Sequence, residues 1–167
     1  IVYVAALGAL WATNSERGLY KTVDGGKTWT LAKFISDKAG FVDLAMDPRD
    51  PNVLYATSWE RIRKAHFLKS GGPGSALWKS TDGGTTWKEI TGGGFPATTK
   101  GRINLAIAAS NPDMVYAMVE ADSVRGAKPQ RLLSGLYRSS NGGASWTWMS
   151  TVNNRPFYFS QIRVDPK

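Results

Sequence analysis

Short runs in which apolar residues occupy at least every second position recur along the whole chain. The clearest of them cover residues 41–46, 53–56, 102–107 and 114–117. This period-two pattern is typical of β-strands with one buried face. Turn-forming Pro, Asn and Asp residues join the runs in pairs, at 47–52 and at 109–113. Each pair is therefore predicted to form an antiparallel hairpin.

A segment of eight residues occurs three times, at 22–29, 80–87 and 139–146. Each copy reads Ser/Thr-x-Asp/Asn-Gly-Gly-x-Ser/Thr-Trp and follows a Leu-Tyr/Trp-Lys/Arg run. Successive copies begin 58 and 59 residues apart. Four antiparallel strands that repeat at such intervals are typical of the blades of a β-propeller. The sequence therefore predicts an all-β protein, a β-propeller segment of four-stranded antiparallel blades.

The strand count through the repeats divides the chain into four parts. Residues 1–40 read as the last three strands of one blade, 41–101 and 102–157 as two complete blades, and 158–167 as the first strand of the next blade. Propellers close with about four to eight blades. We therefore expect an open fragment of a larger propeller, whose remaining blades are the first partners of this segment.

The composition excludes several kinds of chemistry. The chain has no cysteine, which rules out disulfides, thiol nucleophiles and thiolate metal sites. Its single histidine, His66, leaves little room for a zinc site, and we expect neither a metal nor a cofactor. No apolar run reaches the roughly 20 residues of a membrane-spanning helix. We therefore expect no membrane span in this segment.

The charge is strongly positive and gathers in the predicted loops. The chain carries 21 Lys and Arg against 13 Asp and Glu, a net charge of +8. Long connections are predicted at 59–75 and 122–134, on the propeller face opposite the repeated turns, and such length variation is typical of a binding face. These connections hold the basic and aromatic residues that we predict to bind a partner: Trp59, Arg61, Arg63, Lys64, His66, Arg125, Lys128 and Arg131.

A basic and aromatic surface of this kind would fit an acidic peptide, an anionic glycan or another protein. The alternative interpretation is that these are solvated loop charges or contacts to further blades. Nucleic acid is not expected, because the charges form no continuous stripe and the sequence contains no recognisable nucleic-acid-binding module.

The repeated eight-residue segment is identified as the Asp-box, also called the BNR repeat. We expect its polar residue to accept hydrogen bonds from the backbone of its own turn, and its tryptophan to fold back over the hairpin. This assigns structural roles to Asp24, Trp29, Asp82, Trp87, Asn141 and Trp146.

The wider pattern, in which an Asp-Pro turn and a Tyr-Ala strand precede the Leu-Tyr-Lys run and the Asp-box, resembles the sortilin-type propellers. It also resembles the bacterial proteins described as glycosyl hydrolase, BNR repeat. The resemblance implies a periplasmic or extracellular protein, whose signal peptide is not in this segment. We favour an exported propeller scaffold that binds protein, peptide or glycan partners through its top-face loops. The alternative is part of a glycoside hydrolase of the xyloglucanase type, which the resemblance implies would use two catalytic aspartates.

A glycosidase requires two carboxyl groups about 5–10 Å apart. The candidates on the loop face are Asp43, Glu60 and Glu120. Asp43 is replaced by Asn104 at the equivalent repeat position, so the fold itself does not require a carboxylate there. The alternative roles are a polar group that satisfies backbone amides, for Asp43, and solvated rim charges, for the two glutamates. We favour these structural roles, and hence binding over catalysis.

Overall fold

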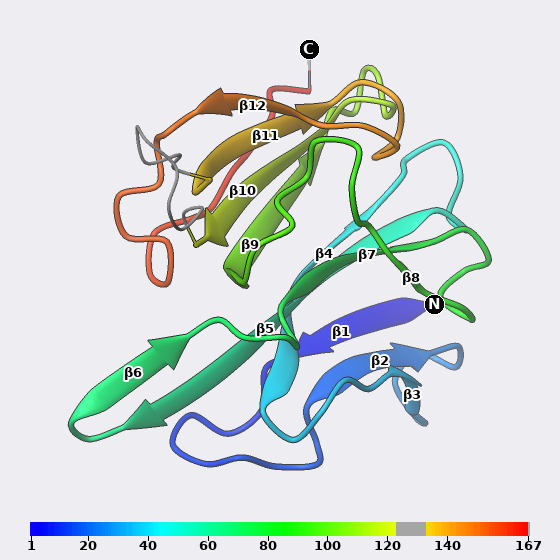
Figure 1. Cartoon of the computed structure of the whole chain (residues 1–167). Helices are drawn as coiled ribbons and strands as arrows, with labels where there is room; N and C mark the ends of the chain where they lie inside the picture. Colours follow the sequence, from blue (N-terminus) through cyan, green and yellow to red (C-terminus); the bar gives the residue numbers. More distant parts are fainter. Residues whose placement is uncertain (123–132, 167) are drawn as a thin grey trace.

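The computed structural model describes residues 1–122 and 133–166, and these residues form three antiparallel β-sheets without a helix (Figure 1). The first sheet has the strand order β1 (Val2–Ala6), β2 (Gly18–Thr22) and β3 (Thr30–Lys33). Each strand pairs with its neighbour in the chain. This meander is what short alternating runs joined by tight turns are expected to form.

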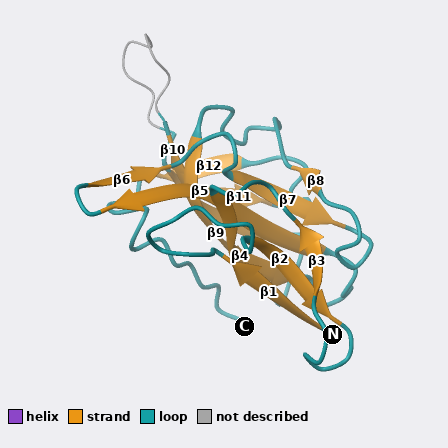
Figure 2. Ribbon diagram, turned by 90° about the horizontal axis from the view of Figure 1, so that it is seen from below, coloured by secondary structure: helices purple, strands orange, loops and turns teal. Residues whose placement is uncertain are grey.

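The second sheet has the order β4 (Ala39–Met46), β5 (Leu54–Lys64), β7 (Ala76–Ser80) and β8 (Lys88–Glu89). Strand β6 (Phe67–Ser70) pairs only with the far half of β5. Figure 1 and Figure 2 both show the β5–β6 hairpin projecting beyond the sheets.

The prediction of a loop at 59–75 is therefore wrong for most of these residues. Residues 59–64 continue β5, and 67–70 return beside them as β6. The run Trp-Glu-Arg-Ile-Arg-Lys has no apolar alternation, and it forms a strand because β6 supplies partners for its backbone hydrogen bonds. The second sheet consequently has a fifth strand in place of the predicted four.

The third sheet has the order β9 (Lys100–Ile107), β10 (Val115–Ala121), β11 (Gly135–Ser139) and β12 (Thr147–Ser150). It is the four-stranded antiparallel blade that the repeat predicts. Residues 158–166, where we predicted the first strand of a further blade, form no strand. A strand exists only when its backbone pairs with a neighbour, and no described strand lies where that pairing would occur.

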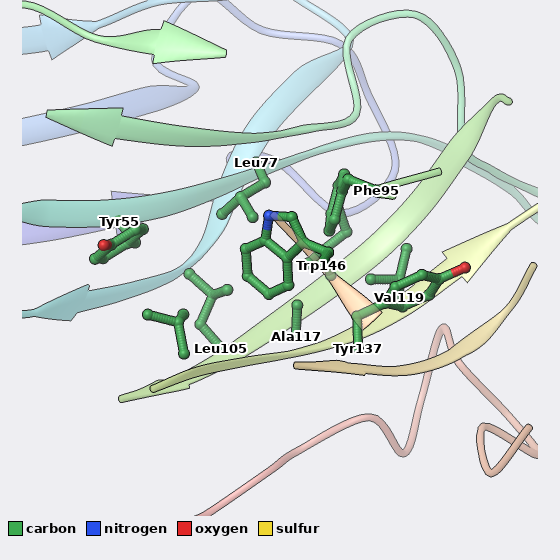
Figure 3. Packing of buried hydrophobic residues seen from close by; sticks show 10 residues of the cluster. Tyr55, Leu77, Phe95, Leu105, Ala117, Val119, Tyr137 and Trp146 are labelled. Carbon is green, nitrogen blue, oxygen red and sulfur yellow. The ribbon is translucent and has the colours of Figure 1, made fainter. Parts of the chain in front are cut away.

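The main hydrophobic core lies between the second and third sheets. Tyr55 and Leu77 enter it from the second sheet, and Val115, Val119 and Tyr137 from the third. Figure 3 shows the indole of Trp146 among these residues, facing Leu77 and Phe95. A smaller core of Leu19, Phe41 and Ala56 joins the first sheet to the second. Apolar burial between successive sheets therefore holds the chain together.

One polar contact is repeated between successive sheets. Tyr3 Oη and Lys21 Nζ donate hydrogen bonds of 2.7 and 2.6 Å to the carbonyl oxygen of Gly83 in the next sheet. Tyr55 Oη and Lys79 Nζ donate the equivalent bonds, 2.9 and 2.7 Å long, to the carbonyl oxygen of Gly142. The same geometry thus relates the first sheet to the second and the second to the third. The chain is a β-propeller segment whose sheets are successive blades.

The three Asp-box tryptophans differ in burial. Trp146 is only 5% exposed, because the linker residue Phe95 packs on its ring at 5.1 Å. Trp87 packs against the smaller core between the first two sheets. Trp29 lies over its own turn, with its ring beside Gly26, but remains 44% exposed. The reason is positional: Trp87 and Trp146 each face the preceding sheet, and no described sheet precedes the first.

Candidate functional site

The sheets have two distinct ends. The Asp-box turns lie at one end, which we call the Asp-box end, since β2, β7 and β11 all run into them. At the opposite end lie the start of β4, the start of β9 and the β5–β6 hairpin, and we call this the hairpin end. A pocket of about 360 Å³ opens there, lined among others by Leu7, Phe41, Trp59, Arg61, Arg102 and Tyr158.

Strand alternation places the pocket residues of β5. Trp59, Arg61 and Arg63 occupy every second position, so they share one face of the strand and all line the pocket. Glu60 lies on the other face, where its Oε1 accepts a hydrogen bond of 3.1 Å from Lys69 Nζ. Glu60, the carboxylate nearest in sequence to these arginines, therefore lies on the other face of the strand and pairs with Lys69 instead.

Arg61 is the most unusual residue of the pocket. Its side chain belongs to a residue only 9% exposed, and its buried Nε has no hydrogen-bond partner. The guanidinium lies 5.4 Å from the centre of the Trp59 ring. Burial, followed by the like charges of Arg17, Arg63 and Arg102, lowers the pKa of Arg61. An arginine still remains protonated at neutral pH, so the pocket contains a buried and uncompensated positive charge.

Arg102 adds a second cation on the same indole. Its guanidinium lies 5.7 Å from the Trp59 ring centre. It is also held by hydrogen bonds from Nε to Asn104 Oδ1, at 3.1 Å, and from Nη1 to the carbonyl oxygen of Phe157, at 3.3 Å. Neither acceptor is charged, so Arg102 is fixed in position without being neutralised.

Arg63 connects the pocket to an exposed aromatic rim. Its guanidinium lies 5.1 Å from the ring centre of Trp11, and its Nη1 donates a 3.2 Å hydrogen bond to Tyr158 Oη. Trp11 is 53% exposed and Tyr158 is 44% exposed. The rim therefore offers two aromatic rings to solvent directly beside the buried cation of Arg61.

Arg17 fixes the loop that carries part of this rim. The residue is 1% exposed, and its guanidinium donates to the carbonyl oxygens of Ala9, Ala12 and Lys38 at 2.9 to 3.2 Å. These bonds tie the segment after β1 to the segment before β4. The tied segment after β1 contains Leu7 and Leu10, which line the pocket, and Trp11, which contacts Arg63.

The three predicted catalytic carboxylates all accept hydrogen bonds from neighbouring groups. Asp43 Oδ2 accepts from the backbone N of Leu105 and from Asn104 Nδ2, at 2.9 and 3.0 Å. Glu60 Oε2 accepts from the backbone N of Gly74 at 3.1 Å, in addition to the Lys69 ion pair. These bonds fix the position of both carboxylates.

Glu120 is also held in position by hydrogen bonds. Its Oε2 accepts 2.8 Å and 2.6 Å hydrogen bonds from the backbone N of Arg102 and from Ser70 Oγ. Ser70 Oγ in turn accepts from the indole N–H of Trp59 at 3.1 Å. Glu120 thus supports the indole on which the two arginines stack, through one intervening hydroxyl.

The remaining predicted binding residues are divided between the hairpin tip and the undescribed segment. Lys64 ends β5, and His66 stands in the β5–β6 turn with its ring 5.3 Å from that of Phe67; neither residue lines the pocket. Arg125, Lys128 and Arg131 lie outside the described residues. Sequence reasoning missed Arg102, which lines the pocket from β9, and Trp11 and Arg17, which lie in the segment between β1 and β2. Residues 59–63 read Trp-Glu-Arg-Ile-Arg and carry no apolar alternation that would have signalled a strand.

The Asp-box turns form a separate and internally bonded structure. Asp82 Oδ1 accepts from the backbone N of Thr86 at 2.9 Å, and Oδ2 from Thr86 Oγ1 at 2.6 Å. These bonds lower the pKa of Asp82 to about 2. Asn141 accepts the equivalent bond from the backbone N of Ser145 at 2.8 Å. The turn is therefore kept when the carboxylate is replaced by an amide.

Two kinds of feature are absent from the described part of the chain. Among residues 1–122 and 133–166, no group of three or more His, Cys, Asp or Glu side chains is arranged to hold a metal ion. The same residues contain no helix with the length and apolarity of a membrane span.

The fold defines the class, a β-propeller, and similarities to known proteins narrow it. No protein-family profile matches the chain. It is 27% identical over 165 residues to a xyloglucanase from a Paenibacillus species, covering 89% of this chain and 14% of that protein. It is 30% identical over 106 residues to the vacuolar protein sorting/targeting protein 10 of Colletotrichum graminicola, covering 64% of this chain and 6% of that protein.

A solved structure supports the fold. The GH74 xyloglucanase from Xanthomonas campestris superposes with a TM-score of 0.53 at 21% identity, covering 84% of this chain and 18% of that one. The chain therefore matches a small part of much longer relatives, which are GH74 xyloglucanases and a sorting protein. Their names favour the glycoside hydrolase alternative over the scaffold that we favoured from the sequence.

Proposed function

We propose that this chain is part of an exported GH74-like glycoside hydrolase and that its hairpin end contacts a xyloglucan-type β-glucan. The single observation that carries the proposal is the similarity to a xyloglucanase over 89% of the chain. The pocket supports it, because an exposed aromatic rim beside a concavity is the kind of surface that packs against the apolar faces of sugar rings.

In this proposal the chain contributes binding, and the catalytic carboxylates lie elsewhere in the protein. Asp43, Glu60 and Glu120 each accept hydrogen bonds from backbone amides. General acid catalysis requires a carboxyl group that is free to exchange its proton with the glycosidic oxygen. We therefore assign these three residues to the support of the sheets and of Trp59.

The test uses the whole protein that contains this sequence and a neutral xyloglucan oligosaccharide. Calorimetry should detect binding, and the double substitution Trp11→Ala with Tyr158→Ala should weaken it by about tenfold, since both rings are exposed at the rim. Trp148→Ala is the matched control, because Trp148 is 45% exposed on the outer strand β12. Equal loss from the control and the double variant, or no binding by the unaltered protein, would contradict the proposal.

A second candidate, a propeller scaffold for proteins or peptides, is favoured by the 30% identity to the sorting protein. This similarity covers fewer residues than the xyloglucanase match. Saturable binding of an unmodified acidic peptide, without binding of the oligosaccharide, would favour this candidate.

A further inference from the structure

The Arg61 pocket contains a charge that the described residues do not balance. Three arginines line it, namely Arg61, Arg63 and Arg102. The ion pairs formed between two residues of 1–122 and 133–166 involve other cations, either Arg49 or Lys69. An uncompensated buried guanidinium is costly, so an anion that pairs with it would relieve that cost.

Arg61 is prepared to bind that anion. Its guanidinium is buried, packs on Trp59 and makes no side-chain hydrogen bond to the described residues, and Nε is entirely without a partner. The planar guanidinium offers donors spaced to grip a carboxylate with two parallel hydrogen bonds. Because Trp59 and Arg17 already fix the surroundings, little ordering remains to be done when the anion binds.

We propose that the Arg61 pocket binds the carboxylate of an acidic sugar, a hexuronic acid carried by the glycan. The proposal rests on the proposed function, which supplies the glycan, and adds the chemical class of one of its substituents. A pocket of about 360 Å³ is at the small end of the roughly 300–1,000 Å³ range of ligand sites, so it suits a single substituent and not an extended chain.

The rim explains the preference for a sugar over a bare anion. Trp11 and Tyr158 both contact Arg63, and both expose their rings. The apolar C–H face of a sugar ring packs on such rings while its carboxylate reaches the buried cation. Inorganic phosphate would use only the arginines, and an acidic peptide would leave the aromatic faces without a matching surface.

The test compares methyl β-D-glucuronide with methyl β-D-glucoside, which differ only in carboxylate against hydroxymethyl. Ligand-observed NMR on the whole protein should show tighter binding of the glucuronide. Arg61→Gln should weaken glucuronide binding by about 10- to 100-fold, the loss expected of a hydrogen-bonded charge pair, and leave the glucoside unchanged. Lys88→Gln on strand β8 is the control with the same change of charge, and should alter neither ligand by more than about twofold.

Thermal unfolding gives an independent readout on the same variant. Arg61→Gln should leave the unfolding midpoint unchanged or raise it, because the substitution removes a buried charge without a partner. A large fall in the midpoint would mean that the guanidinium is a structural group, and would overturn the proposal.

The outcomes distinguish an acidic sugar from a neutral sugar, inorganic phosphate and an acidic peptide as the ligand. Glucuronide binding no tighter than glucoside binding, or equal loss from Lys88→Gln, overturns the inference. Inorganic phosphate or a tetraglutamate peptide that binds as tightly as the glucuronide overturns the sugar assignment. If the neutral xyloglucan oligosaccharide binds and the glucuronide does not, only this inference fails. If the glucuronide binds and the oligosaccharide does not, only the proposed function fails.

Discussion

Asn104 donates a 3.0 Å hydrogen bond from Nδ2 to Oδ2 of Asp43, and so joins the first strands of two neighbouring blades, β9 and β4. The two residues are equivalents in the repeat. Ser160 Oγ donates a 2.7 Å bond to Asn104 Oδ1, which extends the chain of polar contacts toward the segment after the third sheet. A residue first considered as a catalytic acid is therefore a link between blades.

This role makes Asp43 a stability residue. Asp43→Ala leaves the backbone N of Leu105 and the amide of Asn104 without their acceptor, and should lower the free energy of unfolding by about 1–3 kcal/mol. Urea denaturation of the whole protein measures this change. A variant that loses xyloglucan hydrolysis but keeps full stability would instead identify Asp43 as catalytic.

The buried Asp-box tryptophan should be far more costly to remove than an exposed one. Trp146→Ala empties the space between Phe95 and Leu77 and should cost about 3–5 kcal/mol of unfolding free energy. Trp148→Ala, which removes a ring that is 45% exposed, should cost no more than about 1 kcal/mol. Chemical denaturation with both variants in parallel decides the point, and similar losses would argue against the core described above.

The turn at Asp82 should make stability sensitive to acid. Hydrogen bonds from Thr86 and Ser80 lower the pKa of Asp82 to about 2, below the roughly 3.9 of an unfolded aspartate. The contribution is therefore present above about pH 4 and is lost as the pH falls through about 2.

Asp82→Asn should reduce this acid dependence, because an amide at the equivalent position, Asn141, already holds the third turn without a titrating group. Thermal midpoints followed by circular dichroism between pH 2 and pH 7 test this. Asp24→Asn should behave alike, since bonds from Thr28 and Thr22 also lower the pKa of Asp24. Identical pH profiles for the variants and the unaltered protein would refute the assignment.

Much of the fold could be predicted from the sequence, because its signals are local. The period-two runs gave the strand pairs β4–β5 and β9–β10, and the Asp-box gave the turns before β3, β8 and β12. The extension of β5 was missed because its partner β6 has no apolar pattern of its own; residues 67–70 read Phe-Leu-Lys-Ser. The different burial of the three Asp-box tryptophans could not be predicted, because it depends on a neighbouring sheet and not on the motif.

The pocket could be predicted only in part. Trp59, Arg61 and Arg63 were predicted as binding residues because they are aromatic or basic. Their side chains share one face because they lie at alternate positions of β5, and the sequence did not predict this part of the strand. Arg102 comes from β9, whereas Arg17 and the rim residue Trp11 come from the segment between β1 and β2, and only blade packing brings these two distant segments together. No single-sequence pattern records this packing, since the residues share neither spacing nor motif.

The contact between Tyr55 and Gly142 should report on the seam between the second and third sheets. Burial raises the pKa of Tyr55 to about 12, so the neutral hydroxyl that donates to Gly142 is favoured. This contribution is present below the unfolded value of about 10 and is lost as the pH rises through about 12. Tyr55→Phe should cost about 1 kcal/mol at neutral pH.

The ultraviolet absorbance of tyrosinate provides the matching titration. One phenol that titrates near pH 12 should disappear from the profile of Tyr55→Phe. Tyr20→Phe serves as the control, because Tyr20 Oη donates only within its own blade, to the carbonyl oxygen of Glu16. A late phase that survives in Tyr55→Phe would assign the raised pKa to another residue.

The central claim is that the hairpin end, and not the Asp-box end, meets the glycan. Hydrogen exchange of the whole protein with and without a xyloglucan oligosaccharide tests it most directly. We predict slower exchange in the far half of β5, around Trp59–Lys64, and at the start of β9, with unchanged exchange in the Asp-box turns at 81–87 and 140–146. Protection confined to the Asp-box turns, or absent from both ends, would contradict the account.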